Sequence, residues 1–406
     1  MRVLFVSPYY APDLGPSSPL LAMLAEDLVS SGHQVTVLAS VPHFPTGYVA
    51  PEYRKRLWYW ESINGVRVCR VWVPSGDRSN LRHRLLTFII YQLLACWVGF
   101  RVSYDVAFVV NPAIETGLPF TLLVWLRRKP AIFGVWDVYP EVGIQLGIFR
   151  HSVVITLVKA LEDFCIRHAT AVQALSDGFV PNLQKRVERS DKLFVMPPWL
   201  DVDFIRPLPR QNTFSQEHGL DHHFTVIYAG NLGLSQGLEH VLLAAQLLSS
   251  DPRFKFVLVG DGAQREALVS QANQLELTNV QFIPFQPRER LPEVLASADV
   301  CLVSLQPGMG SGSLPSKTFP ILASARPIIA AVEQDSAISF LVEQSQAGVV
   351  VPPSAPKKLA GAILGLAADP QRCQDMATRG REYVVRYHSR QSAARKFENV
   401  LQRICQ

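Results

Sequence analysis

Residues 224–247 read FTVIYAGNLGLSQGLEHVLLAAQL, and they decide the architecture of the second half of the chain. The apolar run FTVIYAGN predicts a buried strand, and EHVLLAAQL predicts a helix. A loop containing Gly230 joins the two. A helix that begins directly after a strand and a glycine loop offers backbone N–H groups and a favourable dipole to a phosphate. Asn231 and Gln236 add neutral hydrogen-bond donors to this predicted anion site.

The same alternation of strands and helices extends in both directions. The predicted strands include RVLFVS, HQVTVLAS, DVAFVVN, AIFGVWD, AVQALS and LFVMPP in the first half, and FKFVLVGDG, VQFIPF, ADVCLVSL, RPIIAAV and AGVVVPP in the second. Such apolar strands, separated by helices, form parallel sheets covered on both faces. The stretch RPLPRQNTFSQEHG, rich in proline and polar residues, reads as a linker.

We therefore expect two doubly wound α/β domains with parallel sheets, residues 1–204 and 205–375, facing a central cleft. The rest of the chain, 376–406, is predicted to form C-terminal helices that pack back on the first domain. The helical pattern there has an expected break near Gly380.

The composition limits the classes of function. A chain of 406 residues with 48% apolar and 18% charged residues suits a large globular protein. Its net charge of +5 allows an acidic ligand or an anionic membrane surface but is too small to indicate nucleic acid. The six cysteines include no CxxC pair, so neither a zinc site nor a disulfide framework is indicated. The N-terminal MRVLFVSPYY lacks the pattern of a signal peptide, and we expect a cytoplasmic protein.

The longest apolar run is LLTFIIYQLLACWVGF, from Leu85 to Phe100, with arginines on both sides. It is shorter than the ~20 residues that span a bilayer, and it contains Gln92. It predicts either a buried helix or a helix lying in a membrane interface. The stretches YRKRLWYW and LPFTLLVWLRRK combine cations with aromatic residues, which favours contact with lipid headgroups.

Two loops of the first domain follow strands, at the edge where ligands bind in such sheets. In SPYYAPDLGPSS, Gly15 either lets the backbone approach a ligand closely or makes a structural turn. In VWDVYPEVG, Asp137 and Glu141 are placed to accept hydrogen bonds from sugar hydroxyls, beside aromatic residues that suit a sugar ring. The alternative for this second loop is a capped turn in which Asp137 bonds backbone N–H groups.

The stretch Met309–Pro327, MGSGSLPSKTFPILASARP, joins a strand to a predicted helix. Lys317 adds a compact positive charge suited to a diphosphate, and Ser313 and Ser316 add hydroxyl groups. The alternative is a solvated loop. If this helix start lies beside Gly230, the two loops form a two-sided phosphate site.

Two smaller features of the second domain are ambiguous. The stretch GDGAQRE resembles a dinucleotide fingerprint, but Arg265 occupies the third glycine position, so we interpret it as a turn from strand to helix. Phe285 lies either against the base of a nucleotide or in the core.

Taken together, these stretches resemble the retaining glycosyltransferase family 4, with its GT-B fold of two facing Rossmann-like domains. The nearest resemblance is to bacterial exopolysaccharide and O-antigen enzymes of the colanic-acid fucosyltransferase kind, and it covers essentially the whole chain. The matching pieces, in order, are YYAPDLGPSS, WDVYPE, LEDFCIRHATAVQALS, PPWLDVDFIRP, YAGNLGLSQGLE, LVGDG, LPSKTFPILASARP and AGVVVPP.

The resemblance also locates departures from the family pattern. An arginine and a lysine often bind the donor phosphates in this family, whereas Asn231 and Gln236 stand at those places here. Lys317 is then the main positive charge expected at the diphosphate. Two glutamates that contact the sugar and the ribose in many members are replaced by Gly312 and Pro320. Ribose contacts must therefore come from elsewhere, for example from backbone groups.

The resemblance implies transfer, with retention, of a hexosyl or deoxyhexosyl group from a UDP- or GDP-sugar to a lipid-linked saccharide at the inner membrane surface. No metal ion or other cofactor is expected, and no nucleic acid partner. Lys317, Asp137 and Glu141 are the expected catalytic residues, with Lys317 stabilising the leaving diphosphate.

Two other classes of function stay open. One is a noncatalytic scaffold that binds a sugar nucleotide in a polysaccharide assembly complex, which the missing glutamates favour. The other is a GT-B sugar-nucleotide epimerase, against which the basic and aromatic surface argues, because an epimerase has no need of a membrane.

Overall fold

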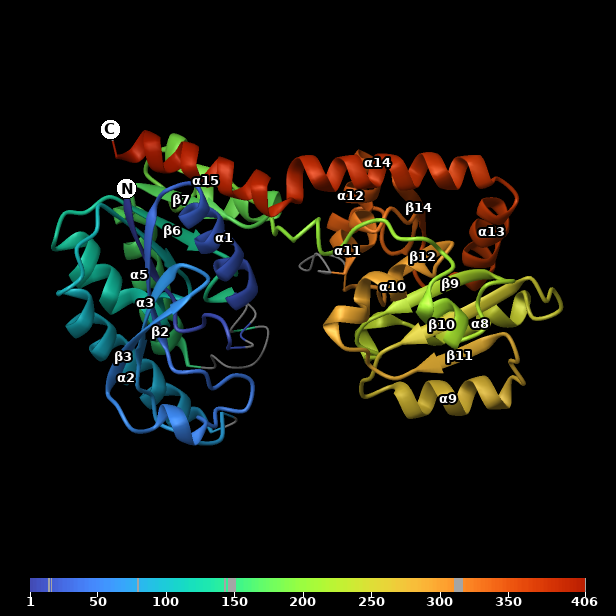
Figure 1. Cartoon of the computed structure of the whole chain (residues 1–406), viewed down its shortest axis with the longest axis horizontal. Helices are drawn as coiled ribbons and strands as arrows, with labels where there is room; N and C mark the ends of the chain where they lie inside the picture. Colours follow the sequence, from blue (N-terminus) through green and yellow to red (C-terminus); the bar gives the residue numbers. More distant parts are fainter. Residues whose placement is uncertain are drawn as a thin grey trace. The chain divides into compact units, whose positions relative to one another are not determined.

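The computed structural model describes residues 1–405 except 14, 16, 79, 142–143, 145–150 and 310–316. The chain forms two compact units, Met1–Pro198 with Arg390–Gln406, and Trp199–Ser389. Each unit is built on its own sheet with helices around it (Figure 1). The predicted class of two α/β domains with parallel sheets is therefore confirmed.

The sheet of the first unit has eight strands in the order β3-β4-β2-β1-β5-β6-β7-β8. The strands are β1 (Arg2–Val6), β2 (Gln34–Ser40), β3 (Trp58–Ile63), β4 (Val66–Val71), β5 (Val106–Val110), β6 (Ala131–Val135), β7 (Ala171–Ala174) and β8 (Leu193–Val195). All neighbours are parallel except β3 and β4. The β3–β4 hairpin was not predicted. Asn64 and Gly65, both with positive φ, form its two-residue turn.

Helices cover both faces of this sheet. The helices are α1 (Ser18–Ser30), α2 (Leu81–Gly99), α3 (Ala113–Pro119) with η2 (Phe120–Trp125), α5 (Ser152–His168), α6 (Val180–Gln184) and α15 (Arg390–Ile404). The side chains of Leu4 and Val6 point into a core shared with α2, α3 and α5. Phe5 points the other way, toward Phe397 of α15, which packs against α1.

The sheet of the second unit has six parallel strands in the order β11-β10-β9-β12-β13-β14. The strands are β9 (Phe224–Ala229), β10 (Phe254–Val259), β11 (Val280–Ile283), β12 (Val300–Ser304), β13 (Ile328–Ala331) and β14 (Gly348–Val351). Helices α8 (Glu239–Leu247), α9 (Arg265–Gln274) and α13 (Pro356–Ala367) pack on one face. The opposite face carries α10 (Leu291–Ala296), α11 (Thr318–Ala323), α12 (Ala337–Ser345) and α14 (Pro370–His388).

The strand order brings particular loops together. In the second unit the chain runs outward from β9 through β10 to β11, and then returns to the other side of β9 with β12. The loops after β9 and β12 therefore leave the sheet side by side at its topological switch point, where ligands bind in this architecture. In the first unit the same reversal lies between β1 and β5.

The C-terminal helices divide differently from the expected boundaries. Helix α14 continues through Gly380 and belongs to the second unit, and the helical break falls at Ser389 instead. Gly380 is a packing residue, because a Cβ there would lie 2.8 Å from the Ala347 side chain and 2.9 Å from that of Leu322. Only α15 returns to the first unit, where Arg390 forms ion pairs with Asp27 and Glu26.

Candidate active site

The loop after β9 has the conformation that its glycines permit. Gly230 adopts a φ of 149° directly after the strand, and Gly237 adopts a φ of 60° just before α8. Both values are unfavourable for other residues, so glycine is required at these positions. Within this described segment, no side chain caps the start of α8. The local sequence thus produces the turn and uncapped helix start that were predicted.

The GDG turn after β10 supports the loop after β9. A Cβ on Gly260 would lie 1.9 Å from the carbonyl oxygen of Gly230, and one on Gly262 would lie 2.5 Å from Oδ1 of Asn231. The backbone N–H of Leu232 donates to the carbonyl of Asp261 at 2.8 Å. These glycines are therefore explained by close backbone packing, in agreement with their interpretation as a turn.

Lys317 lies beside the loop 230–237, as the sequence predicted. Its Nζ donates to the Tyr228 hydroxyl at 2.7 Å and to Oε1 of Gln236 at 2.9 Å. The ammonium group also stands 4.0 Å from the centre of the Tyr228 ring. The Tyr228 hydroxyl donates in turn to the carbonyl of Asn231 at 2.7 Å. Tyr228 was not singled out in the sequence, because it reads there as an ordinary strand residue.

The charge of Lys317 is not balanced by an acid. Lys317 forms no ion pair with any carboxylate in the described part of the chain. Burial lowers the pKa of this lysine to about 7. A desolvated ammonium with only neutral partners is well suited to an anionic ligand, because the ligand supplies the missing counter-charge.

Ser313, Ser316 and Gly312 lie outside the described residues. Helix α11 begins at Thr318, as expected, and Pro320 stands in its first turn. Pro320 offers no side-chain oxygen to a ligand.

Phe285 is a surface residue, with 76% of it exposed, so of the two alternatives for this residue the one in the core is excluded. The preceding residue, Pro284, lines a groove of about 620 Å³ together with Asp261, Gly262, Ala263, Arg265 and Glu266. This groove lies at the carboxyl ends of β10 and β11.

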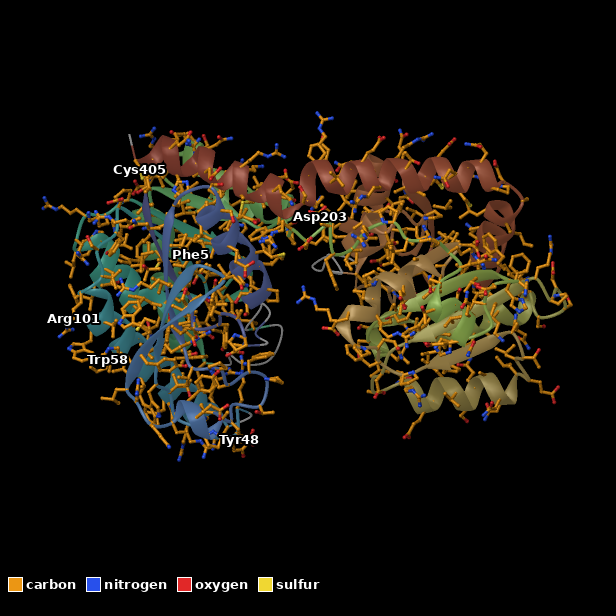
Figure 2. All side chains as sticks on the ribbon, in the orientation of Figure 1. Phe5, Tyr48, Trp58, Arg101, Asp203 and Cys405 are labelled. Carbon is orange, nitrogen blue, oxygen red and sulfur yellow. The ribbon has the colours of Figure 1, made fainter. Side chains whose placement is uncertain are left out.

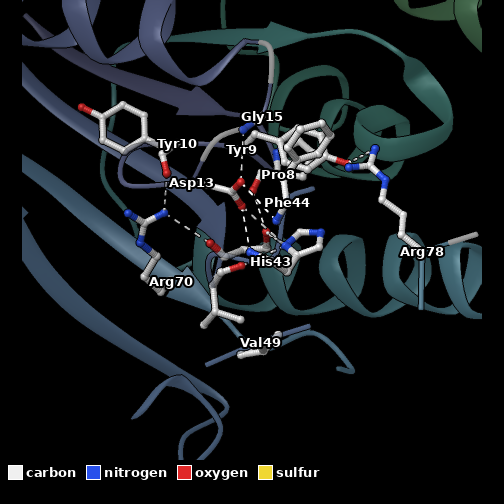
Figure 3. A network of polar contacts seen from close by, with 12 residues as sticks. Pro8, Tyr9, Tyr10, Asp13, Gly15, His43, Phe44, Val49, Arg70 and Arg78 are labelled. Atoms are coloured by element: carbon white, nitrogen blue, oxygen red, sulfur yellow. Dashed lines mark hydrogen bonds and ion pairs between the residues drawn. The ribbon is translucent and has the colours of Figure 1, made fainter. Parts of the chain in front are cut away.

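In the first unit, the loop that contains Gly15 is held by buried polar groups (Figure 3). The Asp13 carboxylate accepts hydrogen bonds from the backbone N–H groups of Gly15, His43 and Phe44. A Cβ on Gly15 would lie 2.6 Å from Cβ of Tyr9, so the chain passes very close to that ring. Gly15 thus lies in close contact with Tyr9 and is hydrogen-bonded through its N–H to Asp13. Asp13 lies within the stretch SPYYAPDLGPSS, but its role in this turn was not predicted.

Arg70 fixes the same loop from strand β4, which β2 separates from β1 in the sheet. Its side chain is fully buried and donates to the backbone carbonyls of Tyr10, Ser40 and Ala11, and to Oε1 of Glu61 at 2.6 Å. Figure 3 shows Arg70 reaching toward the backbone at Tyr10. One guanidinium therefore satisfies several backbone acceptors that the tight turn leaves without partners.

The WDVYPE loop is held by a pair of residues that the sequence did not reveal. The side chain of Asn111 donates to the Asp137 carbonyl at 2.6 Å and accepts from the Trp136 N–H at 2.9 Å. Asn111 also donates to Glu162 at 2.8 Å, and Glu162 accepts from the N–H of Ala113 at 2.8 Å. Burial raises the pKa of Glu162 to about 7. Both residues come from stretches that read as ordinary strand and helix.

The two predicted carboxylates of this loop are placed differently. Asp137 is exposed, and its carboxylate makes no hydrogen bond or ion pair with any described residue. The alternative of a self-capped turn therefore does not apply to the described structure. Glu141 is exposed and accepts from Asn182 at 3.4 Å. Both carboxylates belong to the first unit, whereas Lys317 and Gln236 belong to the second.

A further carboxyl, Glu115, lies near the switch point of the first unit. It is only 7% exposed, and its carboxyl makes no hydrogen bond with a described residue. Burial raises the pKa of Glu115 to about 7, opposed by the charges of Arg78 and Arg84. No motif marked this residue. In the ranges that the structure covers, no cluster of three or more His, Cys, Asp or Glu could hold a metal ion.

Both units match known protein families. Residues 18–199 match the glycosyl transferase 4-like domain, and residues 210–383 match the glycosyl transferases group 1 family. The chain is 25% identical over 412 aligned residues to WcaI of Escherichia coli K12, a protein named for colanic acid biosynthesis, and the match covers 98% of this chain and 99% of the relative. It is 26% identical to WbjE of Pseudomonas aeruginosa, named as a glycosyltransferase, over 62% of this chain and 63% of the relative.

Solved structures support the fold. A sucrose-phosphate synthase from Thermosynechococcus elongatus superimposes with a TM-score of 0.70 at 17% identity, covering 99% of this chain and 98% of that one. HepE from Anabaena, solved in complex with UDP-glucose, gives a TM-score of 0.68 at 16% identity, covering 99% of this chain and 100% of that one. Together with the two family matches and the full-length relative, this shows that the chain belongs to glycosyltransferase family 4 and is a glycosyltransferase of the GT-B fold.

Proposed function

We propose that this glycosyltransferase moves a sugar, with retention, from a UDP- or GDP-sugar to a lipid-linked saccharide in exopolysaccharide or O-antigen assembly. The name of WcaI supports a role in polysaccharide biosynthesis. The complexes of HepE with UDP and with UDP-glucose support a nucleoside diphosphate sugar as donor. The protein would work in the cytoplasm, at the inner face of the membrane, where such acceptors are presented.

The observation that carries the proposal is the unbalanced ammonium of Lys317 beside the glycine loop. The donor diphosphate would occupy the space facing Gly230, Gln236 and Lys317. Gly230 leaves room there, since even a Cβ at this position would stay 3.8 Å from Nζ of Lys317. As the bond from C1 of the sugar to the phosphate oxygen breaks, negative charge grows on the diphosphate, and Lys317 stabilises it.

The remaining predicted residues take supporting roles. The exposed Asp137 and Glu141 would accept hydrogen bonds from sugar hydroxyls. Asn231 and Gln236 would donate amide hydrogens to phosphate oxygens, and Ser313 and Ser316 their hydroxyls. The base would lie in the groove after β10 and β11, beside Phe285. Because Pro320 cannot contact a ribose, backbone groups of this groove are the expected ribose partners. We expect no metal requirement, since Lys317 supplies the charge.

Replacement of Lys317 tests this proposal. Lys317→Ala should lower turnover about a hundredfold or more, as removal of a charge-stabilising donor does in other enzymes. A thermal-shift screen against UDP, GDP, ADP and dTDP identifies the base, because a ligand that binds the native state stabilises it. Near-normal turnover in Lys317→Ala would contradict the proposed role. Retention is checked from the anomeric configuration of the product, and metal independence by activity in EDTA.

One observation favours a second candidate. By the resemblance described above, Pro320 stands where many family members carry a glutamate that contacts the donor. A noncatalytic scaffold that only binds a sugar nucleotide would tolerate the loss of this glutamate. Nucleotide binding without turnover over a panel of donors and lipid-linked acceptors would support the scaffold. Conversion of the donor sugar without an acceptor would indicate an epimerase instead.

A further inference from the structure

Helix α2 carries a continuous apolar face that no described part of its unit covers. The apolar side chains at every fourth position from 81 to 97 are exposed, and those at 86 and 100 extend the stripe. Ile89 and Leu93, in its middle, are 53% and 55% exposed. The exposed apolar residues of this face are Leu81, Leu85, Leu86, Ile89, Leu93, Trp97 and Phe100. Such a stripe exceeds the isolated apolar residues usual on a protein surface.

The fold of the unit does not need this face. The opposite side of α2 packs into the core through Phe88, Tyr91, Ala95 and Val98. Gln92, the polar residue of the apolar run, is turned inward. Its side chain donates to the carbonyl of Ile114 at 3.1 Å and accepts from the N–H of Leu118 at 3.0 Å. The exposed face is therefore not interrupted by Gln92.

Aromatic residues of the edge strand β3 extend the face. Trp58 packs edge-on against Trp97 of α2, with 4.5 Å between ring centres. The guanidinium of Arg101 lies 4.3 Å from the centre of the Trp97 ring, and that of Arg67 lies 4.0 Å from Trp60. Figure 2 shows Trp58 and Arg101 near each other on the same outer side of the first unit. Tryptophan beside arginine is the combination that favours the headgroup layer of a bilayer.

Cations outnumber carboxylates around this face. The sequence of α2 contains no aspartate or glutamate. The exposed carboxylates in and next to α2, β3 and β4 in the sequence are Glu52 and Asp77, whereas the exposed cations of these segments and of the turn after η2 are Arg54, Lys55, Arg56, Arg67, Arg82, Arg101 and Arg128. None of these cations forms an ion pair with a carboxylate within the described ranges. These cations, called the basic rim below, are therefore available to pair with an anionic surface.

We infer that the apolar face of α2 and the aromatic residues of β3 dock on a bilayer containing anionic phospholipids. In the described residues no helix is long and apolar enough to cross a membrane, so α2 would lie along the surface with its apolar side chains among the acyl chains. A second copy of this chain is the less suitable occupant, because its basic rim would face an identical basic rim. The inference deepens the proposed function, since a lipid-linked acceptor is presented at such a surface.

Vesicle sedimentation of the full-length protein tests the inference. The wild type should sediment with vesicles of phosphatidylcholine and phosphatidylglycerol, more weakly with phosphatidylcholine alone, and less in high salt. Ile89→Gln with Leu93→Gln should lower partitioning to both kinds of vesicle about tenfold or more. Lys55→Gln with Arg56→Gln should lower only the partitioning to anionic vesicles, by about thirtyfold, at about fivefold per charge.

Matched controls come from the second unit. Phe340→Gln with Leu364→Gln removes two comparably exposed apolar residues, and Lys357→Gln with Lys358→Gln removes two exposed charges of α13. Both controls should sediment like the wild type. Equal losses in the controls, or no sedimentation of the wild type, would overturn the inference. So would a stable dimer that Ile89→Gln with Leu93→Gln dissociates, if the wild type does not bind vesicles.

Failure of the docking inference can be distinguished from failure of the proposed function. Nucleotide binding, measured by thermal shift with UDP and GDP, should be unchanged in the α2 variants, because these residues lie in the other unit from Lys317. Loss of vesicle binding with nucleotide binding intact bears on the docking face alone. Absence of nucleotide binding in the wild type would instead refute the proposed donor.

Discussion

Donor binding should weaken as the pH rises, because Lys317 would have to be protonated to pair with the diphosphate. Burial lowers the pKa of Lys317 to about 7 in the unliganded protein, and the bound diphosphate should restore it toward the ordinary lysine value of about 10.4. At about pH 8.5 only about 3% of the free protein then carries the charged lysine. The dissociation constant should therefore be about thirtyfold higher at about pH 8.5 than at about pH 6.

Isothermal titration calorimetry measures this dependence. The titrant should be the nucleoside diphosphate sugar rather than the free diphosphate, because both phosphates of the sugar nucleotide stay singly ionised over this pH range. Titrations in two buffers of different ionisation enthalpy should show uptake of about one proton per donor at about pH 8.5, and about none at about pH 6.

Two variants isolate the lysine from other titrating groups. Lys317→Met should bind weakly and without the pH dependence, and Lys317→Arg should also lose it, since arginine stays charged. A wild-type dissociation constant that is constant across this range would refute the reasoning. The same slope in Lys317→Met would assign the titration to another group.

Three further changes test the structure around the sites. Burial raises the pKa of Glu115 and of Glu162 from 4.5 to about 7, so the native state binds each proton more tightly than the unfolded chain does. Between about pH 5 and about pH 8 the free energy of unfolding should therefore fall by about 3 kcal/mol for each of these carboxyls. Urea denaturation of Glu115→Gln at several pH values should show that the part of this fall due to Glu115 is gone. Glu162→Ala should cost about 2–4 kcal/mol by leaving the Ala113 N–H and the Asn111 amide without their acceptor; an unchanged urea midpoint would contradict this. Gly260→Ala should lower the free energy of unfolding by about 3 kcal/mol or more, because its Cβ would collide with the Gly230 carbonyl. Gly361→Ala, at an open position of α13, should instead raise it by about 0.5–1 kcal/mol. Equal thermal midpoints for the two variants would exclude the packing argument.

Local patterns in the sequence were sufficient for most of the fold. Buried parallel strands are apolar along their whole length, so β1, β5, β9 and β12 could be recognised from composition alone. The hairpin β3–β4 was missed because β3 is an edge strand with alternating exposure, and its tryptophans were interpreted as surface residues. The break expected at Gly380 was wrong because that glycine serves close packing between helices rather than a turn.

Residues of the candidate sites could be predicted where they belong to a recognisable sequence motif. Gly230, Gln236 and Lys317 belong to loops with recognisable strand and helix neighbours, and the switch-point rule places such loops together. Tyr228, Asn111 and Glu162 could not be found in this way, because each lies within an ordinary strand, strand end or helix. Their roles depend on partners far away in the chain.

The sequence by itself determined two α/β domains, the loops that carry glycine, lysine and carboxylates, and an apolar run too short to span a bilayer. Only the tertiary structure decided which residues meet. Lys317 reaches Tyr228 across 89 residues of sequence because β12 returns to lie beside β9. It also decided that Gln92 turns inward while Ile89 and Leu93 face outward. Periodicity and turn chemistry are local properties of the chain, whereas burial, pKa and contact partners depend on the order in which the strands assemble.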